Sequence, residues 1–123
     1  MKNLKKLTLL HSNDMHGDFL AESIDETLVG GISLLSGYIN KVRQEEKNVI
    51  YAIAGDMFRG SIIDSEYRGM STIEIMNMLS PDIVTLGNHE TDYGITHLRL
   101  KVFHSSHLRK SWLVVLCMMA QTL

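Results

Sequence analysis

Short apolar runs, separated by polar and glycine-containing stretches, divide the chain into predicted strands. These runs are residues 7–11, 49–54, 83–86 and 112–119. The run at residues 49–54 is apolar throughout, which is typical of a strand that is buried on both faces of a parallel sheet. We therefore expect a parallel sheet with helices on its faces.

Helical spacing of apolar residues fills the intervals between the strands. One helical face is formed by Ile32, Leu35, Ile39 and Val42. Ser71 to Glu74 is a capping-box pattern that opens a second helix. We expect helices at residues 31–47, 71–79 and 95–109, and loops at residues 15–29 and 55–69. Strands that alternate with helices indicate right-handed βαβ units, so the predicted fold class is α/β.

Polar side chains with metal-binding chemistry follow three of the predicted strands. Asp14 and His16 follow the first strand, Asp56 the second, and Asn88 with His89 the third. Because the carboxyl ends of parallel strands share one edge of the sheet, we expect these groups to meet there. Carboxylate, carboxamide and imidazole groups suit a transition metal such as Mn, Zn, Fe or Co. The sequence therefore predicts a metal site at this edge.

The motifs around these residues resemble those of a known family. Segments 13–17 (Asn-Asp-Met-His-Gly), 30–31 (Gly-Gly), 55–61 (Gly-Asp-Met-Phe-Arg-Gly-Ser) and 87–94 (Gly-Asn-His-Glu-Thr-Asp-Tyr-Gly) are similar to the opening motifs of the calcineurin-like metallophosphoesterases. The similarity is greatest to the 5′-nucleotidase branch. It implies the first half of a four-layer αββα sandwich and a divalent-metal-dependent phosphoester hydrolase. The expected substrate is a small phosphate ester, and a nucleotide in particular.

The resemblance also implies a role for each metal ligand. Asp14 and His16 would bind the first of two divalent ions, Asn88 would bind the second, and Asp56 would bridge both. Two ions about 3.5–4 Å apart can convert a bridging water to hydroxide near pH 7, and this hydroxide would attack phosphorus in line with the leaving group.

The same resemblance implies which residues act on the substrate. His89 would stabilise the phosphate in the transition state or protonate the leaving oxygen, and Asp92 would orient His89. Asn88 and His89 would contact the substrate. Arg59 is a weaker candidate for phosphate binding, and its alternative is a solvated loop arginine. Phe58, Tyr67 and Tyr93 could stack on a base, although core or loop packing is the alternative.

The C-terminal part of the sequence departs from the family pattern. Family members complete the site with later histidines, including a Gly-His-x-His motif, whereas this sequence offers only His104 and His107. All 14 acidic residues lie at or before Asp92, which leaves a basic tail. We expect residues 1–98 to form the N-terminal part of a catalytic domain. Residues 99–123 are expected to be an atypical tail, either genuine or produced by truncation or a frame shift.

This departure leaves alternatives to an active hydrolase. One is a catalytically incomplete fragment or pseudoenzyme that binds at most one metal ion weakly. Another is a poorly folding product of an interrupted gene, which would self-associate through an open sheet edge. The order of the motifs favours the hydrolase.

Composition narrows the partner classes. The 123 residues are expected to form one domain, and a formal charge of −2 gives no basic surface for a nucleic acid polymer. A single cysteine excludes an intrachain disulfide and fits a reducing compartment. The apolar run near the N-terminus is too short for a signal peptide, and no stretch is long enough to span a membrane. We therefore expect a cytoplasmic protein that does not bind membranes.

Overall fold

A four-stranded parallel sheet forms the centre of the computed structural model, which describes residues 4–97 and 113–115. Its strands are ordered β1-β4-β5-β6, and every pairing between neighbours is parallel. The strands are β1 (Thr8–Ser12), β4 (Val49–Ala54), β5 (Ile83–Thr85) and β6 (Leu113–Val115). The predicted α/β class and parallel sheet are confirmed, as are the predicted strands where the structure describes them.

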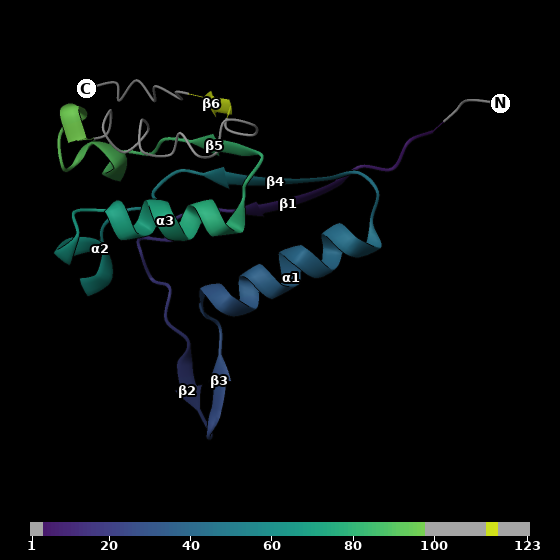
Figure 1. The fold of residues 1–123 in the computed structure, drawn as a ribbon, viewed down its shortest axis with the longest axis horizontal. Coiled ribbons are helices and arrows are strands. Elements are labelled where there is room, and N and C mark those ends of the chain that lie inside the picture. The colour runs from purple at the N-terminus through teal and green to yellow at the C-terminus, as the bar shows by residue number, and fades with distance from the viewer. Residues whose placement is uncertain (1–3, 98–112, 116–123) are drawn as a thin grey trace, which may run out of the picture.

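Two longer helices cover one side of this sheet (Figure 1). They are α1 (Gly31–Glu45) and α3 (Met70–Leu79), close to the predicted ranges. Ile39 of α1 is buried, and Ile32 and Leu35 of the predicted helical face pack against the core. The core itself consists of Phe19, Ile39, Tyr51, Ile53, Met57, Met76, Leu79 and Val84. Among the residues that the structure describes, no helix is long and apolar enough to cross a membrane.

The opposite side of the sheet is more open than predicted. Leu7 and Leu9 are 60% and 63% exposed, whereas Leu10 packs against the core. In β4, Tyr51 and Ile53 are buried but Ala54 is exposed. The prediction that β4 is buried on both faces is therefore wrong for the described part of the chain. Strand β1 forms one edge of the sheet, and self-association through an open edge stays a prediction.

The predicted loop at residues 15–29 contains a β-hairpin instead. Strands β2 (Glu22–Ile24) and β3 (Thr27–Val29) pair in antiparallel fashion and project away from the sheet (Figure 1). Asp25 and Glu26 between them have φ angles of 48° and 61°, as a two-residue hairpin turn requires. The sequence has no Asn-Gly or Asp-Gly signal there. Every residue of both strands is classed as exposed, so no alternation of buried and exposed positions marks them either.

The predicted loop at residues 55–69 contains a short helix, α2 (Ile62–Glu66), whose N-cap Ser61 accepts a hydrogen bond from the backbone N–H of Asp64. The capping box predicted at Ser71 is wrong. Helix α3 begins after Gly69, and the Ser71 hydroxyl donates to the carbonyl of Ile63, 2.7 Å away. Ser71 therefore links α3 to α2 instead of capping a helix. Residues 95–97 are helical, and the rest of the helix predicted at 95–109 lies outside the described residues.

Arg43 links α1 to the end of α3 by hydrogen bonds. Its guanidinium donates to the carbonyl oxygens of Leu79 at 3.2 Å and Ser80 at 2.6 Å, and to the carboxylate of Asp82 at 3.3 Å. The same Asp82 carboxylate accepts a hydrogen bond from the backbone N–H of Tyr51 in β4 at 2.8 Å. One side chain thus joins the helical layer to the sheet.

We predict that Arg43→Met lowers the free energy of unfolding by about 1–3 kcal/mol, because carbonyl and carboxylate groups lose a charged partner. Urea denaturation monitored by circular dichroism measures this change. Lys41→Met is the matched control, since it removes the same charge from the same helix. Lys41 is mostly exposed and forms only a 3.9 Å pair with Glu45, so its loss should cost under about 0.5 kcal/mol. Equal losses in both variants would contradict the prediction.

Candidate functional site

The candidate site begins where β1 and β4 end, because their backbones stay paired beyond the regular strands. The N–H of Asp14 donates to the carbonyl of Gly55 at 3.2 Å, and the N–H of His16 donates to the carbonyl of Asp56 at 3.0 Å. These bonds place the loop after β1 beside the loop after β4. Figure 1 shows that β1, β4 and β5 all point toward this end of the sheet.

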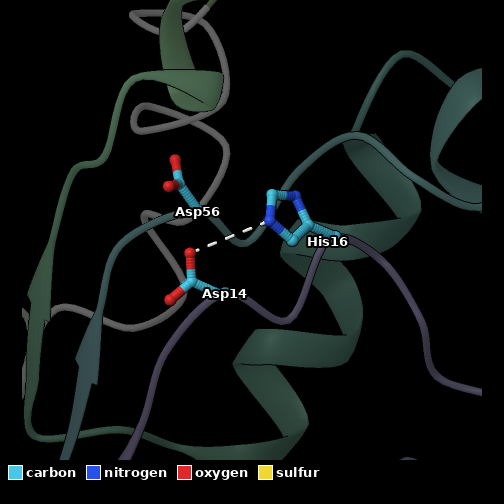
Figure 2. A group of neighbouring side chains, drawn as sticks. All are labelled: Asp14, His16 and Asp56. Carbon is cyan, nitrogen blue, oxygen red and sulfur yellow. Dashed lines mark ion pairs between the residues drawn. The ribbon is translucent and has the colours of Figure 1, made fainter.

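Asp14, His16 and Asp56 converge at this edge. One ligand atom from each lies within 4.8 Å of the others, and Figure 2 shows the three side chains facing a common point. All three have left-handed backbone conformations, with φ angles of 51°, 49° and 51°. Such conformations cost about 1–3 kcal/mol each and cluster at functional sites. The backbone hydrogen bonds between the two loops stabilise these strained conformations.

A backbone carbonyl fixes the orientation of the His16 ring. Nδ1 of His16 lies 3.0 Å from the carbonyl oxygen of Arg59. Because that oxygen can only accept, Nδ1 carries a proton, and in the neutral ring the lone pair lies on Nε2. Nε2 lies 3.8 Å from Oδ1 of Asp14, on the side of the carboxylates. Two carboxylates with one oriented imidazole fit a divalent transition metal ion.

The loop after β5 approaches Asp56 closely. The backbone N–H of His89 donates to Oδ1 of Asp56 at 3.0 Å. A Cβ atom on Gly87 would lie 2.2 Å from the same oxygen, so only glycine fits there. Asn88, between these two residues, has an exposed side chain at the start of the 3₁₀ turn His89–Thr91. The structure thus places Asn88 next to the triad, and its role as a ligand stays a prediction.

His89, Asp92 and Arg59 form a second polar group beside the triad. Nδ1 of His89 lies 2.7 Å from Oδ2 of Asp92, and the same oxygen accepts a hydrogen bond from the Arg59 guanidinium at 2.6 Å. The rings of His89 and His16 meet edge to face with their centroids 5.1 Å apart. The contact between His89 and Asp92 supports the expected orientation of His89. The catalytic roles of both residues stay predictions. Arg59 is 60% exposed, but it is paired rather than merely solvated.

Hydrogen bonding shifts the pKa values of His89 and Asp92. The hydrogen bond to Asp92, aided by the negative charges of Asp92 and Asp56, raises the pKa of His89 above its ordinary value. The hydrogen bonds from His89 and Arg59 lower the pKa of Asp92. Asp92 therefore stays ionised and His89 keeps its proton to a higher pH than a free histidine.

No sequence pattern marks Glu90, whose side chain connects the loop after β4 to the loop after β5. Its side chain is fully buried and accepts hydrogen bonds from the backbone N–H groups of Asp56 at 2.9 Å, Met57 at 2.7 Å and Phe58 at 3.3 Å. It also accepts one from Gly87. Three of these donors lie more than thirty residues away along the chain. No local pattern could have revealed them. Phe58 is itself buried, so packing is confirmed over base stacking.

Comparisons with known proteins identify the family of these motifs. Residues 7–118 match the family described as calcineurin-like phosphoesterase. Mouse 5′-nucleotidase is 38% identical over 100 residues, which cover 76% of this chain and 17% of that protein. Rat 5′-nucleotidase is 37% identical over 100 residues, with the same shares of each chain. The resemblance inferred from the motifs is thereby confirmed.

Solved structures share the fold. A 5′-nucleotidase precursor from Thermus thermophilus superimposes with a TM-score of 0.74 at 30% identity, covering 89% of this chain and 21% of that one. An NAD nucleotidase from Haemophilus influenzae gives a TM-score of 0.69 at 29% identity, covering 80% and 19%. The chain therefore spans about a fifth of the length of these relatives. Its expected assignment to the first half of the αββα sandwich is consistent with them.

We predict that Glu90→Gln lowers the free energy of unfolding by about 3 kcal/mol, because an amide N–H₂ would then face backbone N–H donors in a buried position. Thermal and urea unfolding measure the change. Glu74→Gln is the matched control at an exposed position of α3, where the same substitution should change stability by under about 0.5 kcal/mol. Similar stability of both variants would show that Glu90 does not hold the loops together.

Proposed function

The chain belongs to the calcineurin-like phosphoesterase family, and from this membership we propose that it hydrolyses phosphate esters with divalent metal ions. The observation that carries the proposal is the convergence of Asp14, His16 and Asp56 within 4.8 Å, with His89 packed against His16. A nucleotide is the proposed substrate, because the similar proteins are named 5′-nucleotidases and an NAD nucleotidase. The substrate would be a small molecule.

Four residues are proposed to hold two metal ions. Asp14 and His16 would bind one ion, Asn88 the other, and Asp56 would bridge both through its two carboxylate oxygens. The donor set suits Mn, Zn, Fe or Co. When bound, such ions polarise phosphoryl oxygens and supply a nucleophile at neutral pH. The carbonyl of Arg59 supports this role, because in the neutral ring it places the lone pair of His16 on Nε2, the nitrogen nearer Asp14.

His89 is proposed to act on the substrate phosphate. Its raised pKa favours the protonated ring, which can stabilise negative charge or donate a proton to the leaving oxygen. Asp92 would keep the Nδ1–H of His89 fixed, so that Nε2 faces the substrate. Arg59 would mainly hold Asp92, and its exposed guanidinium offers a further positive charge to the phosphate.

A second candidate function has one observation in its favour. Among the described residues, one group of at least three histidine, cysteine, aspartate or glutamate side chains converges closely enough for a metal ion. This fits a chain that binds a single ion weakly without catalysis. The number of ions bound per chain at saturation distinguishes the two functions, since the hydrolase is proposed to bind two.

We predict that Asp56→Asn abolishes metal-dependent hydrolysis, because it weakens the one ligand proposed to serve both ions. The measurement is hydrolysis of an aryl phosphate and of AMP by the folded chain, with and without Mn²⁺ or Zn²⁺. Isothermal titration with Mn²⁺ gives the affinity and the number of ions. Asp18→Asn is the matched control, since it makes the same substitution at an exposed position of the loop that carries Asp14 and His16.

Full metal-dependent activity in Asp56→Asn would contradict the two-ion site. Folded wild-type chain that binds one ion and releases no phosphate would favour the second candidate function. If Asp18→Asn lost as much Mn²⁺ affinity as Asp56→Asn, the negative charge of the loop would attract the ion without a specific site.

We predict that His89→Ala lowers turnover by about 10²-fold or more while the bound metal content stays nearly unchanged, because His89 acts on phosphate without binding metal. Steady-state kinetics and elemental analysis of the dialysed protein measure the two quantities. A parallel loss of metal would place His89 among the ligands and contradict its proposed role.

A further inference from the structure

Asp64 of α2 is a fully buried carboxylate outside the metal triad. An aspartate is rarely buried so completely unless hydrogen bonds satisfy its oxygens. Oδ2 accepts from the backbone N–H of Arg59 at 2.8 Å and from the hydroxyl of Tyr93 at 3.0 Å. Oδ1 accepts from the hydroxyl of Thr72 on α3. The two oxygens therefore face different parts of the molecule.

One side of Asp64 touches all three loops that carry the site. A Cβ atom on Gly17, in the loop after β1, would lie 2.9 Å from Cβ of Asp64, so this loop packs directly against it. Arg59 belongs to the loop after β4, and Tyr93 belongs to the loop after β5. These contacts add to the backbone bonds between the loops after β1 and β4 and to the hydrogen bonds of Glu90, and they reach Arg59 and Tyr93, which those bonds do not hold.

Arg59 relays this contact to both histidines of the site. Its backbone has a left-handed φ of 66°, which a non-glycine residue keeps only when its neighbours hold it. Its carbonyl accepts from Nδ1 of His16, and its guanidinium pairs with Asp92, which in turn pairs with His89. A shift of the Arg59 peptide would disturb both rings at once.

We propose that Asp64 is a positioning residue of this site, which holds the Arg59 backbone and the Tyr93 hydroxyl so that His16 and His89 keep their Nδ1–H orientations. The inference rests on the proposed function for the meaning of those orientations. A role confined to joining α2 to α3 would need only the bond to Thr72. The bonds at Oδ2 serve the loops instead.

Three variants separate the positioning role from stability. Asp64→Leu keeps the number and branching of the side-chain heavy atoms and removes every acceptor. Asp64→Asn keeps an oxygen for the Arg59 N–H and the Tyr93 hydroxyl, while its amide can donate to Thr72. Thr72→Val is the matched control, because it removes the bond at Oδ1 and leaves those at Oδ2. Unfolding midpoints of all three show how far each is destabilised.

The first readout uses the metal-free chain and the tautomers of its histidines. Long-range ¹H–¹⁵N spectra at about pH 9, where imidazoles are neutral, report which ring nitrogen carries the proton. We expect Nδ1–H forms of His16 and His89 in the wild type, in Thr72→Val and in Asp64→Asn. Asp64→Leu should lose both. Mn²⁺ titration is the second readout, and Asp64→Leu should bind about 10- to 100-fold more weakly.

Several results would overturn the proposal. These are wild-type tautomers and affinity in Asp64→Leu, losses in Thr72→Val as large as those in Asp64→Leu, or failure of Asp64→Asn to restore the signals. If Asp64→Leu does not fold, Asp64→Ala decides the matter, because it removes the same acceptors with a smaller side chain. An unchanged Nδ1–H signal of His89 in that variant would overturn the proposal. If wild-type chain binds no Mn²⁺, the proposed function fails, yet the tautomers still test Asp64.

Discussion

The site depends first on the buried carboxylate of Glu90. It accepts hydrogen bonds from backbone N–H groups of two loops, one carrying Asp56 and the other beginning at Gly87. A carboxyl group is buried at low cost only when such donors surround it, so the closed arrangement of the two loops and the burial of Glu90 depend on each other. In this arrangement the N–H of His89 donates to Asp56, which links the two motifs directly. The parallel sheet delivers both loops to the same edge, and Glu90 fixes their separation.

The second constraint is backbone strain, which the polar network holds in place. Asp14, His16 and Asp56 all adopt left-handed conformations, and this points their side chains toward a common centre. Backbone bonds between the loops after β1 and β4 offset the cost. Arg59 lies at the junction, with its peptide oriented by Asp64 and its side chain holding Asp92. Strain, buried carboxylates and oriented histidines together organise this site.

Local patterns in the sequence were enough to predict the strands, the main helices and the convergence of Asp14, His16 and Asp56. These features depend on apolar periodicity and on the shared edge of parallel strands. The role of Glu90 could not be predicted, because three of the four backbone groups that it binds come from a distant loop. Two of the partners of Asp64 are near it in the sequence, but no pattern marked it as buried. The β2–β3 hairpin was not predicted, because its strands are exposed and show no alternation of buried and exposed residues. The capping box at Ser71 misled because Gly69 in a left-handed conformation starts the helix, and the Ser71 hydroxyl is used to link α3 to α2.

Three loops of this chain are proposed to build a divalent-metal site of the phosphoesterase type. Anomalous diffraction from crystals soaked in Mn²⁺ would test it most directly. The account predicts an anomalous peak within coordination distance of Asp14, His16 and Asp56, and a second peak shared by Asp56 and Asn88. Mn²⁺ bound elsewhere on well-ordered protein, with no anomalous density between these side chains, would contradict it.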